Sequence, residues 1–147
     1  SPDGSFTDKP DAAVVVFGET PYAEFQGDRA ALLLDPEHTG PFATMKKLKA
    51  QGIPVVAVMI TGRPLYANPA LNAADAFVVA WLPGSEGGGI ADVLVGAGAG
   101  RPRFDFTGKL PAAWPRTAQI ADGALFPFGY GLSYSSPVQP FAPLPEL

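Results

Sequence analysis

The sequence predicts an α/β domain whose mostly parallel sheet is flanked by helices, an α/β sandwich. Three short apolar runs rich in β-branched residues, at 12–17, 54–60 and 76–82, are each followed by glycine or polar residues, as buried strands are. Helical patterns separate them, over 41–52 and, as a short helix at best, over 69–74. Strands that alternate with helices favour a parallel sheet. Three strands make a thin sheet, so we expect an incomplete domain of a larger two-domain protein.

The first helix is marked by its ends and by its apolar face. The segment 41–52 starts with proline, which suits the first turn of a helix, and ends with glycine, which suits its stop. Its apolar residues recur at three-residue steps, at Phe42, Met45 and Leu48. This spacing places them on one side of a helix, and we expect that side to face the sheet.

The sequence after the third strand is richer in glycine. A helix is predicted over 85–96, with Ser85 as its N-cap. The three glycines that follow Ser85 and Glu86 weaken the first turn, so the firm part of this helix is 90–95. The segment 108–115 predicts an extended strand at the edge of a sheet. Its two prolines lack a backbone N–H, so they cannot donate the hydrogen bonds that a central strand makes to both neighbours.

Composition and charge exclude several classes of protein. Of 147 residues, 47% are hydrophobic and 16% charged, which is typical of a globular chain. The net charge is −4, and Lys and Arg form no dense block, so neither nucleic acid nor a membrane is an expected partner. The chain has no cysteine, which excludes disulfides and thiolate chemistry.

Three parts of the chain are predicted. A polar leader occupies 1–11, the α/β domain 12–134 and a proline-rich tail 135–147. The tail favours two interpretations equally, a disordered end and a segment that docks on another domain. Docking would use its apolar residues, which are Val138, Phe141, Ala142, Leu144 and Leu147.

Two glutamates follow the first predicted strand, and they are the main candidates for chemistry. Ligands of parallel sheets bind at the carboxyl ends of the strands, where Glu19 and Glu24 are expected. A general acid needs such a placement, together with partial removal from water. The alternative is that both are solvated loop acids or caps for backbone donors, and residue type alone favours this alternative.

Further charged residues are expected to support the same edge. Asp28 and Arg29 are predicted to form an ion pair that holds the loop, and Arg63, after the second strand, to pair with a nearby acid or reach a ligand. Glu86 lies in a glycine-rich loop, which resembles a phosphate-binding loop, but its charge repels phosphate and no lysine accompanies it.

Other catalytic arrangements find little support. His38 is the sole histidine, so a histidine metal site is not expected, and no G-x-S-x-G motif indicates a serine hydrolase. Trp81 and Trp114, with Tyr22 and Tyr130, suit either sugar stacking or the core, and the core is favoured for both tryptophans. No cofactor and no metal are implied.

Several stretches together resemble one known family. "VVVFGETPYAEFQGDR", "VVAVMITGRPLYANPAL", "AWLPGSEGGGIADVLVG", "FTGKLPAAWPR" and "LFPFGYGLSY" follow one another in the order and spacing of glycoside hydrolase family 3. The chain is similar to the C-terminal α/β-sandwich domain of its β-glucosidase and exo-β-glucanase branch, over nearly its whole length.

The resemblance implies a shared active site. In the family, a (β/α)8 barrel carries an aspartate nucleophile, and the sandwich domain supplies the glutamate acid/base of a retaining reaction. Carried over to this chain, the acid/base role falls on Glu19 in preference to Glu24. Glu24 and Tyr22 are then expected near the substrate. The residues expected to support the loops are Asp28, Arg29, Arg63 and Glu86.

The expected substrate is a β-glucoside or β-glucan oligosaccharide, and the expected partner is a barrel in the same protein or in a separate chain. Without that barrel we expect no activity. The family also implies a periplasmic or extracellular location. The alternative hypothesis is a non-catalytic carbohydrate-binding or structural module.

Overall fold

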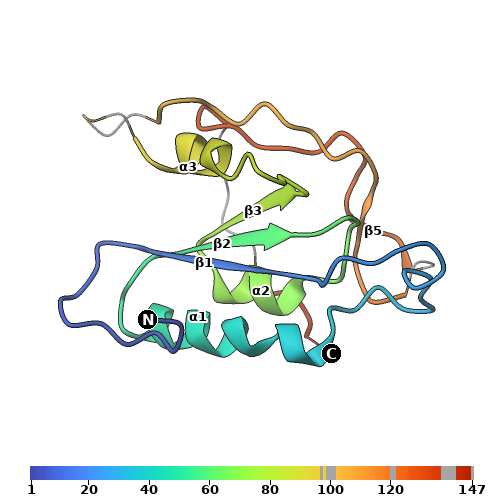
Figure 1. The fold of residues 1–147 in the computed structure, drawn as a ribbon, viewed down its shortest axis with the longest axis horizontal. Coiled ribbons are helices and arrows are strands. Elements are labelled where there is room, and N and C mark those ends of the chain that lie inside the picture. The colour runs from blue at the N-terminus through green and yellow to red at the C-terminus, as the bar shows by residue number, and fades with distance from the viewer. Residues whose placement is uncertain (97, 99–101, 120–121, 137–141, 147) are drawn as a thin grey trace.

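The computed structural model describes residues 1–96, 98, 102–119, 122–136 and 142–146. At its centre is a parallel sheet with the strand order β1-β2-β3. The strands are β1 (Ala13–Gly18), β2 (Val55–Ile60) and β3 (Ala76–Trp81). Two helices, α1 (Gly40–Ala50) and α2 (Asn68–Ala73), cover one face of this sheet, and α3 (Gly88–Leu94) lies over the other (Figure 1). The α/β prediction is therefore confirmed.

Shorter elements complete the described chain. A 3-10 helix, η1 (Pro36–His38), precedes α1. A small antiparallel sheet pairs β4 (Trp114–Pro115) with β5 (Ala124–Phe126). The extended strand expected over 108–115 is thus reduced to its last two residues. Among the described residues, no helix has the length and apolar character that crossing a bilayer requires.

Helix α1 follows the sequence prediction closely. Met45 and Leu48 are buried in the core, and Phe42 packs edge-on against Phe17 of β1, with ring centres 5.2 Å apart. Gly52 has φ of +69°, which side-chain-bearing residues rarely adopt, and its N–H closes the last turn. The local pattern was sufficient here because this helix has one apolar side and one polar side.

Helix α3 differs from its prediction at the start. It begins at Gly88, and the residue at its N-cap is Gly87, so the prediction of Ser85 as N-cap is wrong. The residues before the helix form a turn of their own, in which the Glu86 N–H donates to the Pro83 carbonyl and the Ser85 hydroxyl to the Glu86 carboxylate. The Ser85 hydroxyl therefore binds its neighbour in this turn and caps no backbone N–H of the helix, which begins three residues later.

The core lies between the sheet and the α1/α2 layer. Val55, Leu65 and Trp114 are fully or almost fully buried there. Burial on both faces was expected of all three strands. It holds best for the central strand β2, whereas no residue of β3 is fully buried and Val14 and Val16, on the second face of β1, are exposed. The reason is that β1 forms an edge of the sheet and that a groove separates it from α3.

The end of the tail packs on the domain itself. Asn72 of α2 exchanges two hydrogen bonds of 2.9 Å with the backbone of Leu144. The Pro145 carbonyl accepts from the Tyr66 hydroxyl and the Asn68 amide, at 3.0 and 2.9 Å. Residues 142–146 are thus docked on this chain, which neither expected alternative described. Three of the apolar tail residues lie outside the described residues: Val138, Phe141 and Leu147.

Candidate active site

The carboxyl ends of the three strands meet at one edge, on the right of Figure 1. We call residues 19–29, which follow β1 there, the acid loop. The ladder continues one residue beyond the strands, because the Glu19 N–H donates to the Ile60 carbonyl at 3.2 Å and the Thr61 N–H to the Trp81 carbonyl at 3.1 Å. Glu19 and Thr61 therefore lie side by side, directly after β1 and β2.

Glycine is required at the point where the acid loop begins. A Cβ built on Gly18 would overlap the backbone carbonyl oxygen of Ile60 on the neighbouring strand. Because backbone cannot move aside as a flexible side chain can, a larger residue would push β1 away from β2. Gly18 thus allows Glu19 to lie close against the end of β2.

The Glu19 carboxylate is buried and fully engaged. Its Oε1 accepts from the Thr61 hydroxyl at 2.7 Å and from the Gly62 N–H at 3.2 Å. Its Oε2 accepts from Nε and Nη2 of Arg63, at 3.3 and 3.0 Å. The side chain is 8% exposed. Each oxygen already has two donors, so little of this carboxylate remains available to a ligand.

Arg63 connects three points of the acid loop. Besides Glu19, its guanidinium donates to the Gly27 carbonyl. Its central carbon also lies 4.2 Å from the centre of the Tyr22 ring, a cation–π contact. Since the Arg63 side chain is only 17% exposed, these contacts are shielded from water. The start, middle and far side of the loop are therefore tied to one residue at the end of β2.

The far end of the loop has a second anchor. Arg29 donates two hydrogen bonds to the two Asp35 oxygens, at 2.5 and 2.8 Å. The ion pair expected between Asp28 and Arg29 is therefore wrong, because Arg29 binds both oxygens of Asp35, the residue before η1, instead. The hydrogen bond from Arg29 holds the pKa of Asp35 below its usual value.

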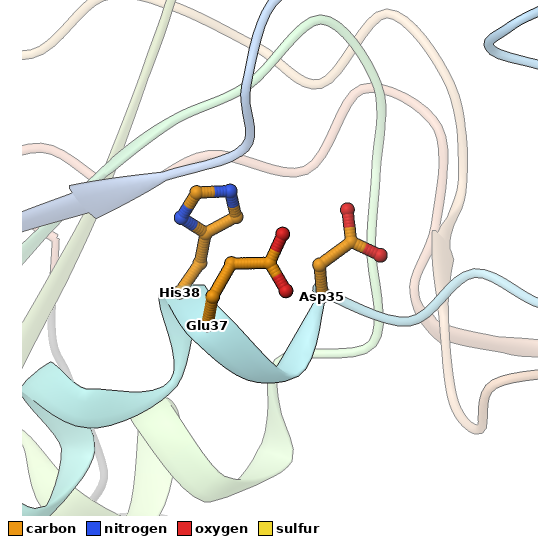
Figure 2. A group of neighbouring side chains, drawn as sticks. All are labelled: Asp35, Glu37 and His38. Atoms are coloured by element: carbon orange, nitrogen blue, oxygen red, sulfur yellow. The ribbon is translucent and has the colours of Figure 1, made fainter.

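A third contact joins the loop to η1. The Thr20 hydroxyl and Nε2 of His38 share a hydrogen bond of 2.9 Å. Asp35, Glu37 and His38 project to the same side of η1, and one ligand atom from each lies within 4.8 Å of the others (Figure 2). Because Arg29 already occupies both Asp35 oxygens and Thr20 binds His38, we interpret these residues as loop anchors and assign no metal. This role of His38 has no local signal in the sequence, because Thr20 lies 18 residues before it.

The tip of the acid loop contrasts with its anchored ends. Glu24 is exposed, and among the described residues its carboxylate has no hydrogen-bond or ion-pair partner. Phe25 follows with φ of +66° and a side chain that is 77% exposed. Two backbone hydrogen bonds close the turn, from Gly27 to Ala23 and from Asp28 to Phe25. The tip therefore presents a free carboxylate and a free aromatic ring on a closed turn.

The remaining candidates are distributed differently. Tyr22 belongs to the acid loop and lies on Arg63. Glu86 is exposed on the loop before α3, where its carboxylate accepts from the Ser85 hydroxyl, and no hydrogen bond or ion pair of the described chain joins it to the acid loop. Trp81 and Trp114 pack together at 6.3 Å, which confirms them as core aromatics, and Tyr130 stacks on Phe126.

The family model of the "Glycosyl hydrolase family 3 C-terminal domain" matches residues 4–134. The chain is 33% identical to a periplasmic beta-glucosidase of Salmonella typhimurium, a match that covers 86% of this chain and 19% of that protein. It is 39% identical to a xylan 1,4-beta-xylosidase of Xylanibacter ruminicola, with 75% of this chain and 14% of that protein covered.

A solved structure is more similar still in sequence. The exo-1,3/1,4-beta-glucanase of a Pseudoalteromonas species is 48% identical over 99% of this chain and 19% of its own, with a TM-score of 0.87. The chain thus spans about a fifth or less of the length of each of these proteins. With a family model that matches most of its residues, the chain belongs to glycoside hydrolase family 3, as the C-terminal domain found in its β-glucosidase- and glucanase-type enzymes.

Proposed function

We propose that this chain supplies the general acid/base to a retaining β-glucosidase or exo-β-glucanase whose nucleophile lies in a (β/α)8 barrel outside residues 1–147. Membership of the family supports the reaction class, since the relatives named above are glycoside hydrolases. The acid loop supports the residue role, because its anchored turn at the strand ends holds a carboxylate that no described residue pairs with.

We assign the acid/base role to Glu24, which reverses the order of preference that the sequence suggested. A general acid must give its proton to the glycosidic oxygen, so its carboxyl must reach the substrate. Glu19 is 8% exposed and each of its oxygens accepts two hydrogen bonds, whereas Glu24 is exposed and has no such partner among the described residues. This contrast within one loop is the observation that carries the assignment, and Glu19 becomes the anchor of the loop.

The reaction then proceeds in two steps. The protonated Glu24 gives its proton to the glycosidic oxygen while an aspartate of the barrel attacks the anomeric carbon, so the glycosidic C–O bond breaks and a glycosyl-aspartate ester forms. The Glu24 carboxylate next takes a proton from water, whose oxygen attacks the same carbon and releases the aspartate. A retaining reaction of this kind requires the two carboxyl groups about 5–5.5 Å apart.

The exposure of Glu24 predicts that the chain alone is inactive. A general acid that works near neutral pH needs its charged form to be disfavoured by removal from water. In this chain Glu24 is exposed to solvent, so the barrel must supply the covering surface as well as the nucleophile. We therefore infer that the site is assembled between two domains.

For the substrate we propose terminal β-D-glucosyl residues of β-glucosides or β-glucan oligosaccharides. A relative named as a xylosidase makes β-xylosides the comparison to test. The relative named as a periplasmic beta-glucosidase supports a periplasmic or extracellular location for this chain.

The test uses a hybrid enzyme, in which this full chain replaces the segment that it matches in the Pseudoalteromonas glucanase. We expect hydrolysis of a glucose disaccharide, with aryl β-glucosides cleaved faster than aryl β-xylosides. Glu24→Gln should lower kcat on the disaccharide by about 10²–10⁴-fold, the usual contribution of acid–base catalysis. The value of kcat/KM for β-glucosyl fluoride should fall far less than that for the disaccharide, because fluoride leaves without a proton and kcat/KM reports the first step. The second step still needs Glu24 as its base, so kcat should fall on both substrates.

Two matched variants complete the design. Glu86→Gln changes another exposed glutamate and should leave kcat unchanged. Glu19→Gln should destabilise the domain, and the folded fraction should keep the ratio of disaccharide to fluoride activity. If Glu19→Gln alone loses the disaccharide activity selectively, the acid/base is Glu19. A folded hybrid that binds glucose and cleaves nothing favours the non-catalytic module.

A further inference from the structure

We infer that the ring of Phe25 binds the leaving-group sugar of the substrate by stacking against it. This inference rests on the proposed acid/base role of Glu24. Phe25 then determines specificity on the leaving-group side of the site. Its ring contacts no other aromatic ring of the described chain.

The backbone of Phe25 is the first observation. Its φ of +66° lies in the left-handed region, which bulky residues rarely adopt. The turn holds it there, through hydrogen bonds of 3.3 Å from Gly27 to Ala23 and 3.1 Å from Asp28 to Phe25. Strained residues persist where the surroundings enforce them, and they are concentrated at binding and catalytic sites.

The ring itself is the second observation. It is 77% exposed, on a loop whose base is fixed by Arg63 and Arg29. An aromatic ring that is held in place but left uncovered offers a flat apolar surface. The C–H face of a pyranose ring is a suitable partner for such a surface, and sites of this kind combine aromatic side chains with a few polar groups.

The position next to Glu24 decides which sugar the ring can reach. Consecutive Cα atoms are about 3.8 Å apart, and a general acid lies about 2.6–3.2 Å from the oxygen that it protonates. That oxygen belongs to the leaving group, whereas the other sugar faces the nucleophile. We therefore place the ring of Phe25, on the residue after the acid, beside the leaving sugar.

Two other exposed apolar side chains fit this role less well. Phe128 is also highly exposed, but it follows β5 and is far from Glu24 in the sequence. Leu82 lies beside Gly62, close to Tyr22, and offers no flat ring. Phe25 alone of these three combines an aromatic ring with adjacency to the acid.

The experiment compares substrates with and without a leaving sugar in the hybrid enzyme. Phe25→Asn and Phe25→Gly remove the ring and accept a positive φ, so the turn can keep its shape. We expect kcat/KM for a glucose disaccharide to fall about tenfold in both variants, as when one good ligand contact is lost. The value for β-glucosyl fluoride, which has no leaving sugar, should stay unchanged, and Phe25→Trp should keep the disaccharide activity.

The outcomes separate this inference from the proposed function. Equal losses on the disaccharide and the fluoride would overturn it, because they would place Phe25 in loop geometry or in a contact with the barrel. No loss on either substrate would also overturn it. Selective loss in Glu24→Gln without selective loss in the Phe25 variants leaves the acid/base role intact and refutes the stacking role alone. If Glu24→Gln loses nothing, the proposed function fails whatever the Phe25 variants do.

Discussion

Replacing Arg63 with methionine tests whether the acid loop depends on one buried ion pair. The substitution Arg63→Met keeps an unbranched apolar stem and removes the guanidinium. It therefore removes two hydrogen bonds to Glu19, one to the Gly27 carbonyl and the cation–π contact with Tyr22. The Glu19 carboxylate stays buried with a charge that no longer has an opposite partner.

The expected loss in the free energy of unfolding is about 2–4 kcal/mol. Removing one partner of a buried ion pair costs about 3–5 kcal/mol, because the other charge is left uncompensated. Glu19 keeps the bonds from the Thr61 hydroxyl and the Gly62 N–H, which reduces that cost. The expected loss therefore lies at or slightly below the lower end of the range for a fully broken buried pair.

The measurement is equilibrium unfolding of the full chain in urea, followed by the fluorescence of the buried Trp114 and its neighbour Trp81. The matched control is Arg103→Met. Arg103 pairs with Asp92 at 3.0 Å, the same distance as the Arg63–Glu19 pair, but the two side chains are 58% and 39% exposed. An exposed pair contributes about 0–1 kcal/mol, so the control should lose little.

Equal losses in the two variants would refute the reasoning, since the same Arg→Met change breaks an ion pair of the same length in both, and the Arg63 pair is the more buried and the more connected one. A change in the urea m-value of Arg63→Met would point to a different unfolded or native state and would also remove the basis of the comparison. In the hybrid enzyme, the surviving folded fraction of Arg63→Met should show a lower kcat, because the turn that carries Glu24 has lost its central anchor.

Two further predictions concern the second anchor and the tail. Because Arg29 lowers the pKa of Asp35, this pair stabilises the fold above the unfolded carboxyl pKa of about 3.9, and its contribution disappears as the pH falls through the lower folded pKa. The urea midpoint of the unchanged chain should therefore exceed that of Asp35→Asn by the largest amount at pH 6, and the difference should vanish toward pH 2. A difference that does not change with pH would contradict a role for the ionised Asp35. Asn72→Ala removes both hydrogen bonds to Leu144. The Leu144 amide should then exchange its hydrogen faster, and the free energy of unfolding should fall by about 1–2 kcal/mol. Unchanged exchange would mean that other contacts hold the tail.

Local pattern was enough to predict the main elements. Proline at the start, glycine at the stop and an apolar residue at every third position defined α1, since each of these preferences acts within one or two turns of the chain. The same kind of evidence failed for the two faces of β1, because the exposure of Val14 and Val16 depends on what lies across the sheet. A run of β-branched residues carries no information about that neighbour.

For the candidate site, the sequence by itself determined that an acidic loop follows a strand at the carboxyl edge of a parallel sheet. Which of its two glutamates is free was decided by the tertiary structure alone. Glu19 and Glu24 have the same side chain and lie five residues apart in one loop, so no local rule separates them. What separates them is Arg63, 44 residues beyond Glu19 in the chain. The pairing of β1 with β2 brings Arg63 against Glu19, whereas no hydrogen bond or ion pair of the described residues joins it to Glu24.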